Sequence, residues 1–274
     1  MDYQIILVYC LCADLLKALG HKEDKQCQMS DAEVMTTGLV AALFFGGKHN
    51  LACAMLKEQK YIPGMLSKSQ FSRRLQQLDY LFIALFQVLG ESFKELNEES
   101  VYIIDSAPIA VCDNIRIRRN KIYGDEAHRG YQASKRRYFY GVKIHLLVTK
   151  DHQPVEFFLS PGGFSDVDAL TQFDFALPEG SQIFADKAYT HYLVEDILDE
   201  ADIQLAPDRK KNSKRPMPPW LQFFLRHYRN QVETAGSLIE RLLPKSIHAV
   251  TAKGFELKVI LFVLASSINC LGTA

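Results

Sequence analysis

The stretch VYIIDSAPIAV, residues 101–111, sets one acidic side chain, Asp105, into an apolar run rich in β-branched residues. It predicts a buried strand that ends at or near Asp105, because a charge without a partner is poorly tolerated inside a strand. The stretch SQIFADKAY, residues 181–189, repeats this arrangement with Asp186. Ligands collect at the strand ends of open α/β sheets, so the two aspartates could share divalent metal.

Either aspartate alone has an ordinary structural explanation. An aspartate at a strand end is often a helix cap or a turn former. The metal interpretation is favoured by the presence of two such residues within a suitable order of elements.

That order predicts a mixed sheet flanked by helices. Beyond the strand at residue 101, the patterns indicate two strands, 138–149 and 154–160, joined by a tight hairpin at 150–153. A short helix at 165–175 and a strand that ends at Asp186 follow. The last expected elements are a helix at 190–200, a brief strand at 203–207 and a long helix from about 220 to 243. Asp166 and Asp168 are expected to cap the short helix, and His145 is expected to be a satisfied core histidine.

The helix expected at 220–243 carries a third candidate carboxylate. Its apolar residues fall on one arc, and Glu233 and Glu240 lie on an adjoining stripe together with Arg226 and Arg229. A carboxylate at the border of the buried face can reach the strand ends, and both Glu233 and Glu240 qualify. The same stripe could also be a solvated row of salt bridges, with Arg229 and Glu233 as an i, i+4 pair.

The first hundred residues have helical periodicity throughout, so we expect a helical DNA-binding or assembly domain at 1–97 and a catalytic domain at 98–274. Within the first domain, Ser69 is a plausible N-cap for a helix that carries Arg73 and Arg74. A helix-turn-helix recognition helix has this pattern, but so does an ordinary solvated helix.

Formal net charge is zero, with 32 basic and 32 acidic residues, yet the charges are segregated. Residues 116–143 hold nine Lys or Arg against two acids, and residues 209–229 hold seven against none. Basic patches provide DNA affinity that is independent of sequence. The residues expected to contact DNA are Lys135, Arg136, Arg137, Arg209, Lys210 and Lys211, in addition to Arg73, Arg74, Arg226 and Arg229.

The composition indicates a cytoplasmic protein without a membrane span. The apolar stretch IILVYCLCADLL, residues 5–16, is too short to cross a bilayer and lacks the flanks of a signal peptide. Six scattered cysteines have no pair at metal-ligand spacing and are expected to be reduced.

These residues resemble the DDE transposases of bacterial insertion sequences, and in particular insertion-sequence family 982. The matching features are IIDSAPI around Asp105, GVKIHLLVT, PGGFSDVDAL, FADKAY around Asp186, and RNQVET around Glu233 followed by HAVTAKGFELK. They cover about residues 100 to 260. One departure is that Arg226 and Glu240 stand where many such transposases carry Tyr and Lys, so Arg241 or Lys245 would have to replace the usual Lys contact to DNA.

The resemblance implies a ribonuclease-H-like fold in which Asp105, Asp186 and Glu233 bind two Mg²⁺ or Mn²⁺ ions and catalyse DNA cleavage and strand transfer. It implies double-stranded DNA as partner, namely the terminal inverted repeats and a target, and a homodimer on that DNA. Two alternatives remain: a ribonuclease-H-like nuclease without strand transfer, and an inactive DNA-binding protein descended from a transposase.

Overall fold

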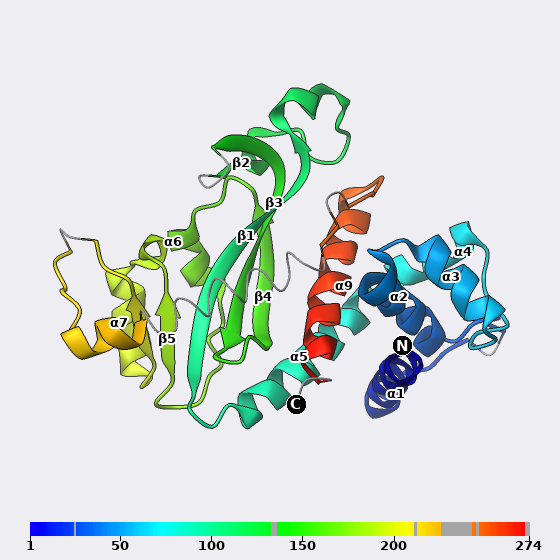
Figure 1. The fold of residues 1–274 in the computed structure, drawn as a ribbon, viewed down its shortest axis with the longest axis horizontal. Helices are drawn as coiled ribbons and strands as arrows, with labels where there is room; N and C mark the ends of the chain where they lie inside the picture. Colours follow the sequence, from blue (N-terminus) through cyan, green and yellow to red (C-terminus); the bar gives the residue numbers. More distant parts are fainter. Residues whose placement is uncertain (25, 133–135, 211–212, 226–242, 245–246, 272–274) are drawn as a thin grey trace. The chain divides into compact units, whose positions relative to one another are not determined.

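The computed structural model describes residues 1–24, 26–132, 136–210, 213–225, 243–244 and 247–271. Contacts divide the chain into two compact units (Figure 1). The helical unit comprises Met1–Val88 and Ile239–Ala274, and the sheet unit comprises Leu89–Leu238. The division therefore falls inside one helix, α5, Asp79–Leu96.

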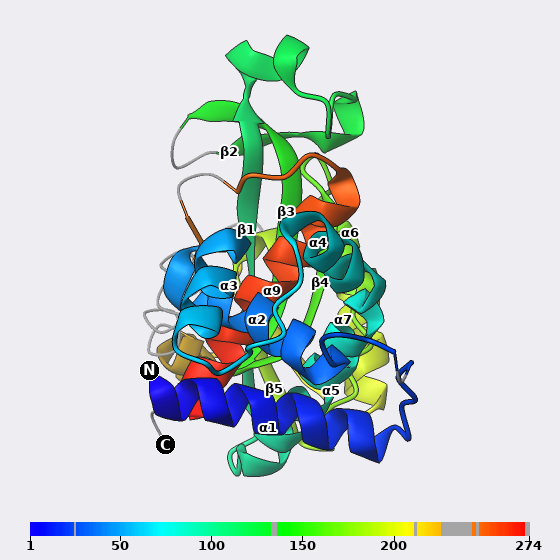
Figure 2. The ribbon, with the colours of Figure 1, turned by 90° about the vertical axis from the view of Figure 1, so that its right-hand side faces the viewer.

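The helical unit is built around α2, which is buried along most of its length. Its other helices are α1 (Asp2–Ala18), α3 (His49–Glu58), α4 (Lys68–Gln77), the first part of α5, and α9 (Ala252–Leu271), with α2 itself at Asp31–Phe45. Helices α1, α3, α4 and α9 all contact α2. Figure 2 shows α1 along its whole length. The helical character expected for the amino-terminal region is confirmed.

Local signals explain where these helices begin and end. Ser30 caps α2 through a capping box with Glu33, and Gly46 ends α2 in the left-handed conformation that glycine adopts without strain. The expected cap of α4 at Ser69 is wrong: the cap lies two residues earlier, where Ser67 forms a capping box with Gln70. Gln70, three residues after Ser67, accepts the reciprocal hydrogen bond from the backbone N–H of Ser67. Ser69 has no glutamine or glutamate three residues later.

Helix α9 is long and apolar enough to cross a membrane by composition alone. In its apolar window, 61% is buried inside the protein, and the bent pair α2 and α3 passes the same test only if counted as one span. Contacts with α2 and α4 account for the apolar sequence of α9, because a helix that is apolar all round suits a buried position.

The sheet unit contains a six-stranded mixed sheet. The strands are β1 (Val101–Asp113), β2 (Arg129–Gln132), β3 (Arg137–Thr149), β4 (Pro154–Pro161), β5 (Gln182–Ala185) and β6 (Gln204–Pro207). Their order is β2-β3-β1-β5-β6, with β4 also paired to β3. The ladders of β3 with β1, β2 and β4 are antiparallel, and those of β5 with β1 and β6 are parallel. The expected mixed sheet is confirmed.

One strand boundary was predicted wrongly. Strand β1 does not end at Asp105 but continues to Asp113, because its antiparallel partner β3 supplies hydrogen bonds beyond that point and pairs Leu146 with Asp105. The parallel ladder with β5 does end there, at the pair Ile104 and Ala185. The short strand β2 at residues 129–132 was not expected either.

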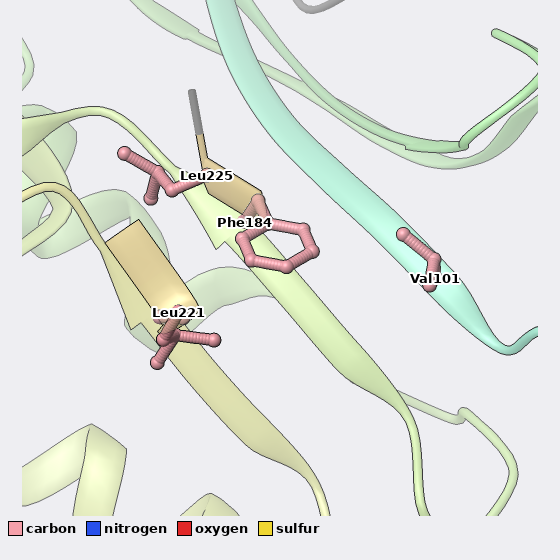
Figure 3. Packing of buried hydrophobic residues seen from close by; sticks show 5 residues of the cluster. Val101, Phe184, Leu221 and Leu225 are labelled. Carbon is pink, nitrogen blue, oxygen red and sulfur yellow. The ribbon is translucent and has the colours of Figure 1, made fainter. Parts of the chain in front are cut away.

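Helices flank the sheet as expected. Residues 219–225 are helical, and Leu221 and Leu225 from this segment pack against Val101, Phe184 and Ala206 of β1, β5 and β6 (Figure 3). Helix α7, Tyr192–Glu200, contacts β6. The end of α5 approaches β4 so closely that a Cβ at Gly90 would lie 2.7 Å from the carbonyl oxygen of Val155. The start of the long helix expected near residue 220 is confirmed, and its continuation lies outside the described residues.

Candidate active site at the strand ends

The parallel ladder brings Asp105 and Asp186 to neighbouring positions. The last pair of the β1–β5 register is Ile104 with Ala185, and each aspartate is the next residue of its strand. Asp186 keeps an extended backbone, with φ −73° and ψ 166°. Neighbouring strands lie about 4.8 Å apart, so the two carboxylates start from backbone positions within reach of a common ion.

A third aspartate, Asp208, continues the same row. The β5–β6 register ends at Ala185 with Pro207, and the backbone N–H of Asp208 donates to the carbonyl of Ala185 at 2.9 Å. Lys187 lies between these strand ends: its N–H donates to Asp186 Oδ1 at 2.7 Å, and its ammonium is 3.2 Å from Asp208 Oδ2. Three parallel strands therefore each end their ladder beside an aspartate.

A fourth carboxylate, that of Asp166, is held beside Asp105 by a polar network. The Ser106 hydroxyl donates to Asp166 Oδ1 at 3.0 Å, and the Lys143 ammonium lies 3.2 Å from the same oxygen. Lys143 also donates to the carbonyl of Phe164. The expected capping role belongs instead to Ser165, whose hydroxyl accepts from the N–H of Val167, because the Asp166 carboxylate points to β1 and β3. Asp168 is exposed.

The pKa of the buried Tyr189 hydroxyl is affected by its burial and by the charges of Asp166, Asp105 and Asp186. Burial raises this pKa well above the ordinary value, and the negative charges of the three aspartates raise it further. Three carboxylates thus lie within electrostatic range of a single hydroxyl. Such a concentration of acids around one buried hydroxyl is unfavourable unless a cation or a hydrogen-bond donor compensates it.

The donor set fits a hard divalent cation. Mg²⁺ and Mn²⁺ prefer carboxylate oxygens, and Asp105 and Asp186 both follow the last pair of the β1–β5 ladder. Because Lys143 and Ser106 engage Asp166, Asp105 and Asp186 are the candidate metal ligands.

Several predicted site residues lie outside the described residues. They are the third ligand Glu233, its alternative Glu240, and Arg226, Arg229, Lys211 and Lys135. Their expected roles therefore stay predictions.

Two of the arginines expected to contact DNA form ion pairs inside the protein. Arg209 makes two hydrogen bonds to Glu195, at 2.7 and 2.8 Å, and both side chains are largely buried. Arg74 pairs with Asp31 and also donates to the carbonyl of Met29. Arg73, Lys210, Arg136 and Arg137 are exposed, and Arg136 has a positive φ of 47° in the turn before β3.

His145 is buried in the core of the sheet unit, as expected. Its Nε2 lies 2.9 Å from Ser160 Oγ, and its ring stacks on Phe158 with centroids 4.7 Å apart. Burial is the main cause that lowers the pKa of His145 to about 4. It is therefore neutral at physiological pH.

A second group of potential ligands lies in the helical unit. Side-chain atoms of His21, Glu23 and Asp31 lie within 4.8 Å of one another. His21 Nε2 is 2.8 Å from Asp31, and Glu23 accepts from the N–H of Asp31. Arg74 already supplies the positive charge in this cluster, which joins α4 to the start of α2.

Sequence reasoning missed Asp166, Asp208 and Tyr189 as neighbours of the site. Asp208 directly follows the predicted strand at 203–207, so the strand-end rule that selected Asp105 and Asp186 would have selected it too. Asp166 carries no comparable signal, because its position depends on contacts with Ser106 and Lys143, which lie far away in the sequence.

A family model described as "Transposase DDE domain" matches residues 96–246. No curated protein matches the chain. Among solved structures, a piggyBac transposase synaptic complex with hairpin DNA has 9% identity and a TM-score of 0.44, and the similarity covers 96% of this chain and 73% of that one. A Mos1 transposase paired-end complex with the left transposon end has 13% identity and a TM-score of 0.27, and 83% and 82% of the two chains are covered.

Proposed function

Because the chain belongs to the transposase DDE domain family, we propose that it cleaves DNA at the ends of a bacterial insertion sequence of family 982 and transfers the resulting strands to target DNA. The observation that carries this proposal is the parallel register that places Asp105 next to Asp186.

In the proposed site, Asp105, Asp186 and Glu233 would hold two divalent ions, with Asp105 as the ligand that both ions share. When bound, such ions activate an oxygen nucleophile and stabilise the leaving oxygen of a phosphodiester. The protein's own contribution is to hold the carboxylates in place. The N–H of Ser106 donates to Asp105 Oδ1 at 2.8 Å, and the N–H of Lys187 does the same for Asp186.

Each of these backbone donors fixes one oxygen of the carboxylate that it contacts. Lys143 neutralises Asp166 in part and so limits the repulsion that Asp105 experiences.

Double-stranded DNA is the proposed partner, and the protein would bind it as a homodimer. Exposed basic residues of the sheet unit, including Lys210, Arg136 and Arg137, would bind its phosphates. We propose residues 1–97 as the DNA-binding or assembly domain and residues 98–274 as the catalytic domain. A nuclease without strand transfer and an inactive DNA-binding protein are the two alternatives.

The test is Mg²⁺-dependent cleavage and joining of labelled DNA that carries the element's terminal repeats. We expect Asp105→Asn and Asp186→Asn each to abolish both steps, whereas Asp168→Asn, the exposed aspartate nearby, should retain wild-type activity. Cleavage without joining would support the nuclease alternative. Cleavage that persists in Asp105→Asn would refute the metal assignment.

Two further variants decide the third ligand. Glu233→Gln should be inactive and Glu240→Gln active, and the reverse result would exchange their roles. Light scattering of the protein with and without terminal-repeat DNA tests the proposed homodimer.

A further inference from the structure

The helical unit contains a large pocket that the catalytic proposal does not use. Its cavity volume is about 1040 Å³, and its walls come from the start of α3, from α4, from α9 and from the segment before α9. All of the residues that line it belong to the helical unit. The pocket is therefore complete without any residue of the sheet unit.

The lining is positively charged in a chain whose net charge is zero. It contains Lys48, Lys68, Lys258, His49 and His248, and no Asp or Glu occurs among the lining residues that the structure describes. The three lysines form no ion pair with any described residue. The ammonium of Lys258 donates instead to the carbonyl of His248 at 2.6 Å. The positive charge of the pocket is thus not neutralised by the described part of the chain.

The floor of the pocket is apolar. Phe71 and Leu75 of α4 and Leu257 and Phe262 of α9 contribute to it, and each is at most 3% exposed. Charges beside such a floor are poorly screened, so an anion that enters the pocket interacts with the lysines more strongly than it would on an open surface.

The backbone before α3 is shaped to form this wall. Gly46 and Gly47 both have positive φ, 54° and 74°, and a Cβ at Gly47 would lie 3.0 Å from the ring of Phe262. Glycine at these positions lets the chain turn sharply after α2, which brings Lys48 and His49 to the pocket.

Two titratable groups of the pocket, His49 and Lys258, are partly buried. Burial, together with the charge of Lys258, lowers the pKa of His49 to about 4, and burial lowers the pKa of Lys258. The Nε2 atom of His49 is buried without a hydrogen-bond partner among the described residues. A bound phosphate would compensate the lysine charge and provide an acceptor for this nitrogen.

We propose that this pocket of the helical unit binds a phosphodiester of the DNA strand, with Lys48, Lys68 and Lys258 around the phosphate. This inference rests on the proposed function, because it takes DNA as the ligand. It assigns to the helical unit a contact that is separate from the catalytic carboxylates.

The test measures binding of a short fluorescent DNA duplex to the full chain by anisotropy, without Mg²⁺ and over a series of NaCl concentrations. The double variant Lys48→Gln with Lys68→Gln changes two exposed residues of the pocket. We expect it to bind more weakly, with a slope of log affinity against log salt that is smaller by about two. For Lys258→Gln we expect this slope to be smaller by about one. Lys258→Arg should restore the slope.

The matched control is Lys253→Gln. Lys253 lies on the same helix, is paired with Asp79 and does not line the pocket, so this variant should bind like the wild type. Wild-type slopes in the double variant would overturn the proposal. Binding of polyglutamate that equals DNA binding and depends on the same lysines would overturn the assignment of a phosphodiester.

A second measurement reads the pocket directly. Histidine NMR of the full chain should show the pKa of His49 rising when the duplex is added, and no rise would count against the proposal. Wild-type binding by the pocket variants would refute the pocket and leave the catalytic proposal untouched. Cleavage that persists in Asp105→Asn would refute the catalytic proposal whatever the pocket variants do.

Discussion

The ammonium nitrogen of Lys187 lies 3.2 Å from Oδ2 of Asp208, and this ion pair joins the segment after β5 to the segment after β6. Lys187 is 47% exposed, so the pair contributes no more than about 1 kcal/mol to the free energy of unfolding. Its importance lies in its position, because the same residue holds Asp186 through its backbone N–H.

We therefore predict that Lys187→Met changes metal binding more than stability. Removing a positive charge beside Asp186 and Asp208 should tighten Mn²⁺ binding, by up to about fivefold for a charge near the protein surface. Mn²⁺ titration followed by electron paramagnetic resonance measures this change in the absence of DNA. The control is Lys150→Met, which removes a charge paired with Glu99 at the opposite end of β1. Weaker Mn²⁺ binding in Lys187→Met would contradict the electrostatic argument.

The buried His145 should make the protein less stable in acid. Its pKa is about 4 in the folded protein against 6.5 ordinarily, so the unfolded chain binds more protons between these values. The free energy of unfolding should therefore fall as pH drops from 6.5 towards 4, by on the order of 1–3 kcal/mol for this group. Urea unfolding at several pH values tests this, with His145→Leu expected to reduce the pH dependence.

Gly141 should tolerate no side chain. A Cβ at this position would lie 2.2 Å from the carbonyl oxygen of Ile109, next to the irregular register of β1 and β3. We expect Gly141→Ala to lower the free energy of unfolding by about 1–3 kcal/mol, because backbone atoms rather than a flexible side chain must move. Gly124→Ala is the matched control, since a Cβ there meets nothing within 4 Å. Equal stability of the two variants would show that the ladder adapts.

The pair formed by Arg209 and Glu195 separates a structural from a DNA-binding role. Arg209→Met leaves the buried carboxylate of Glu195 without its main partner, so a loss of about 3–5 kcal/mol is expected in chemical denaturation. Lys210→Gln, at the exposed neighbouring residue, should leave stability unchanged and reduce the salt slope of DNA binding by about one. A normal slope in Lys210→Gln would remove this loop from the DNA interface.

Much of the sheet could be predicted because its signal is local. The apolar runs at β1, β3, β4, β5 and β6 are visible as sequence patterns, and so are the turns between them. The extension of β1 past Asp105 and the strand β2 both depend on hydrogen bonds from β3. The local sequence of residues 106–113 and 129–132 does not indicate this pairing.

The same distinction applies to the candidate site. Asp105 and Asp186 were recognisable because each interrupts or follows an apolar strand. Asp166 was mistaken for a cap, since its partners Ser106 and Lys143 become neighbours only when β1 and β3 pair. The lysines of the pocket were not predicted for a similar reason: Lys48, Lys68 and Lys258 come from three helices or their caps.

Helix α2 contacts α9, and α9 lies more than 200 residues later in the chain. The helical unit is therefore discontinuous, with the whole sheet unit inserted between its parts. During synthesis on the ribosome, the sheet unit emerges before α9 does, and it can fold first because domains generally fold as units. The apolar surface of α2 that α9 covers is buried only after α9 has been synthesised. A nascent chain stalled before residue 252 would therefore expose that surface to chaperones.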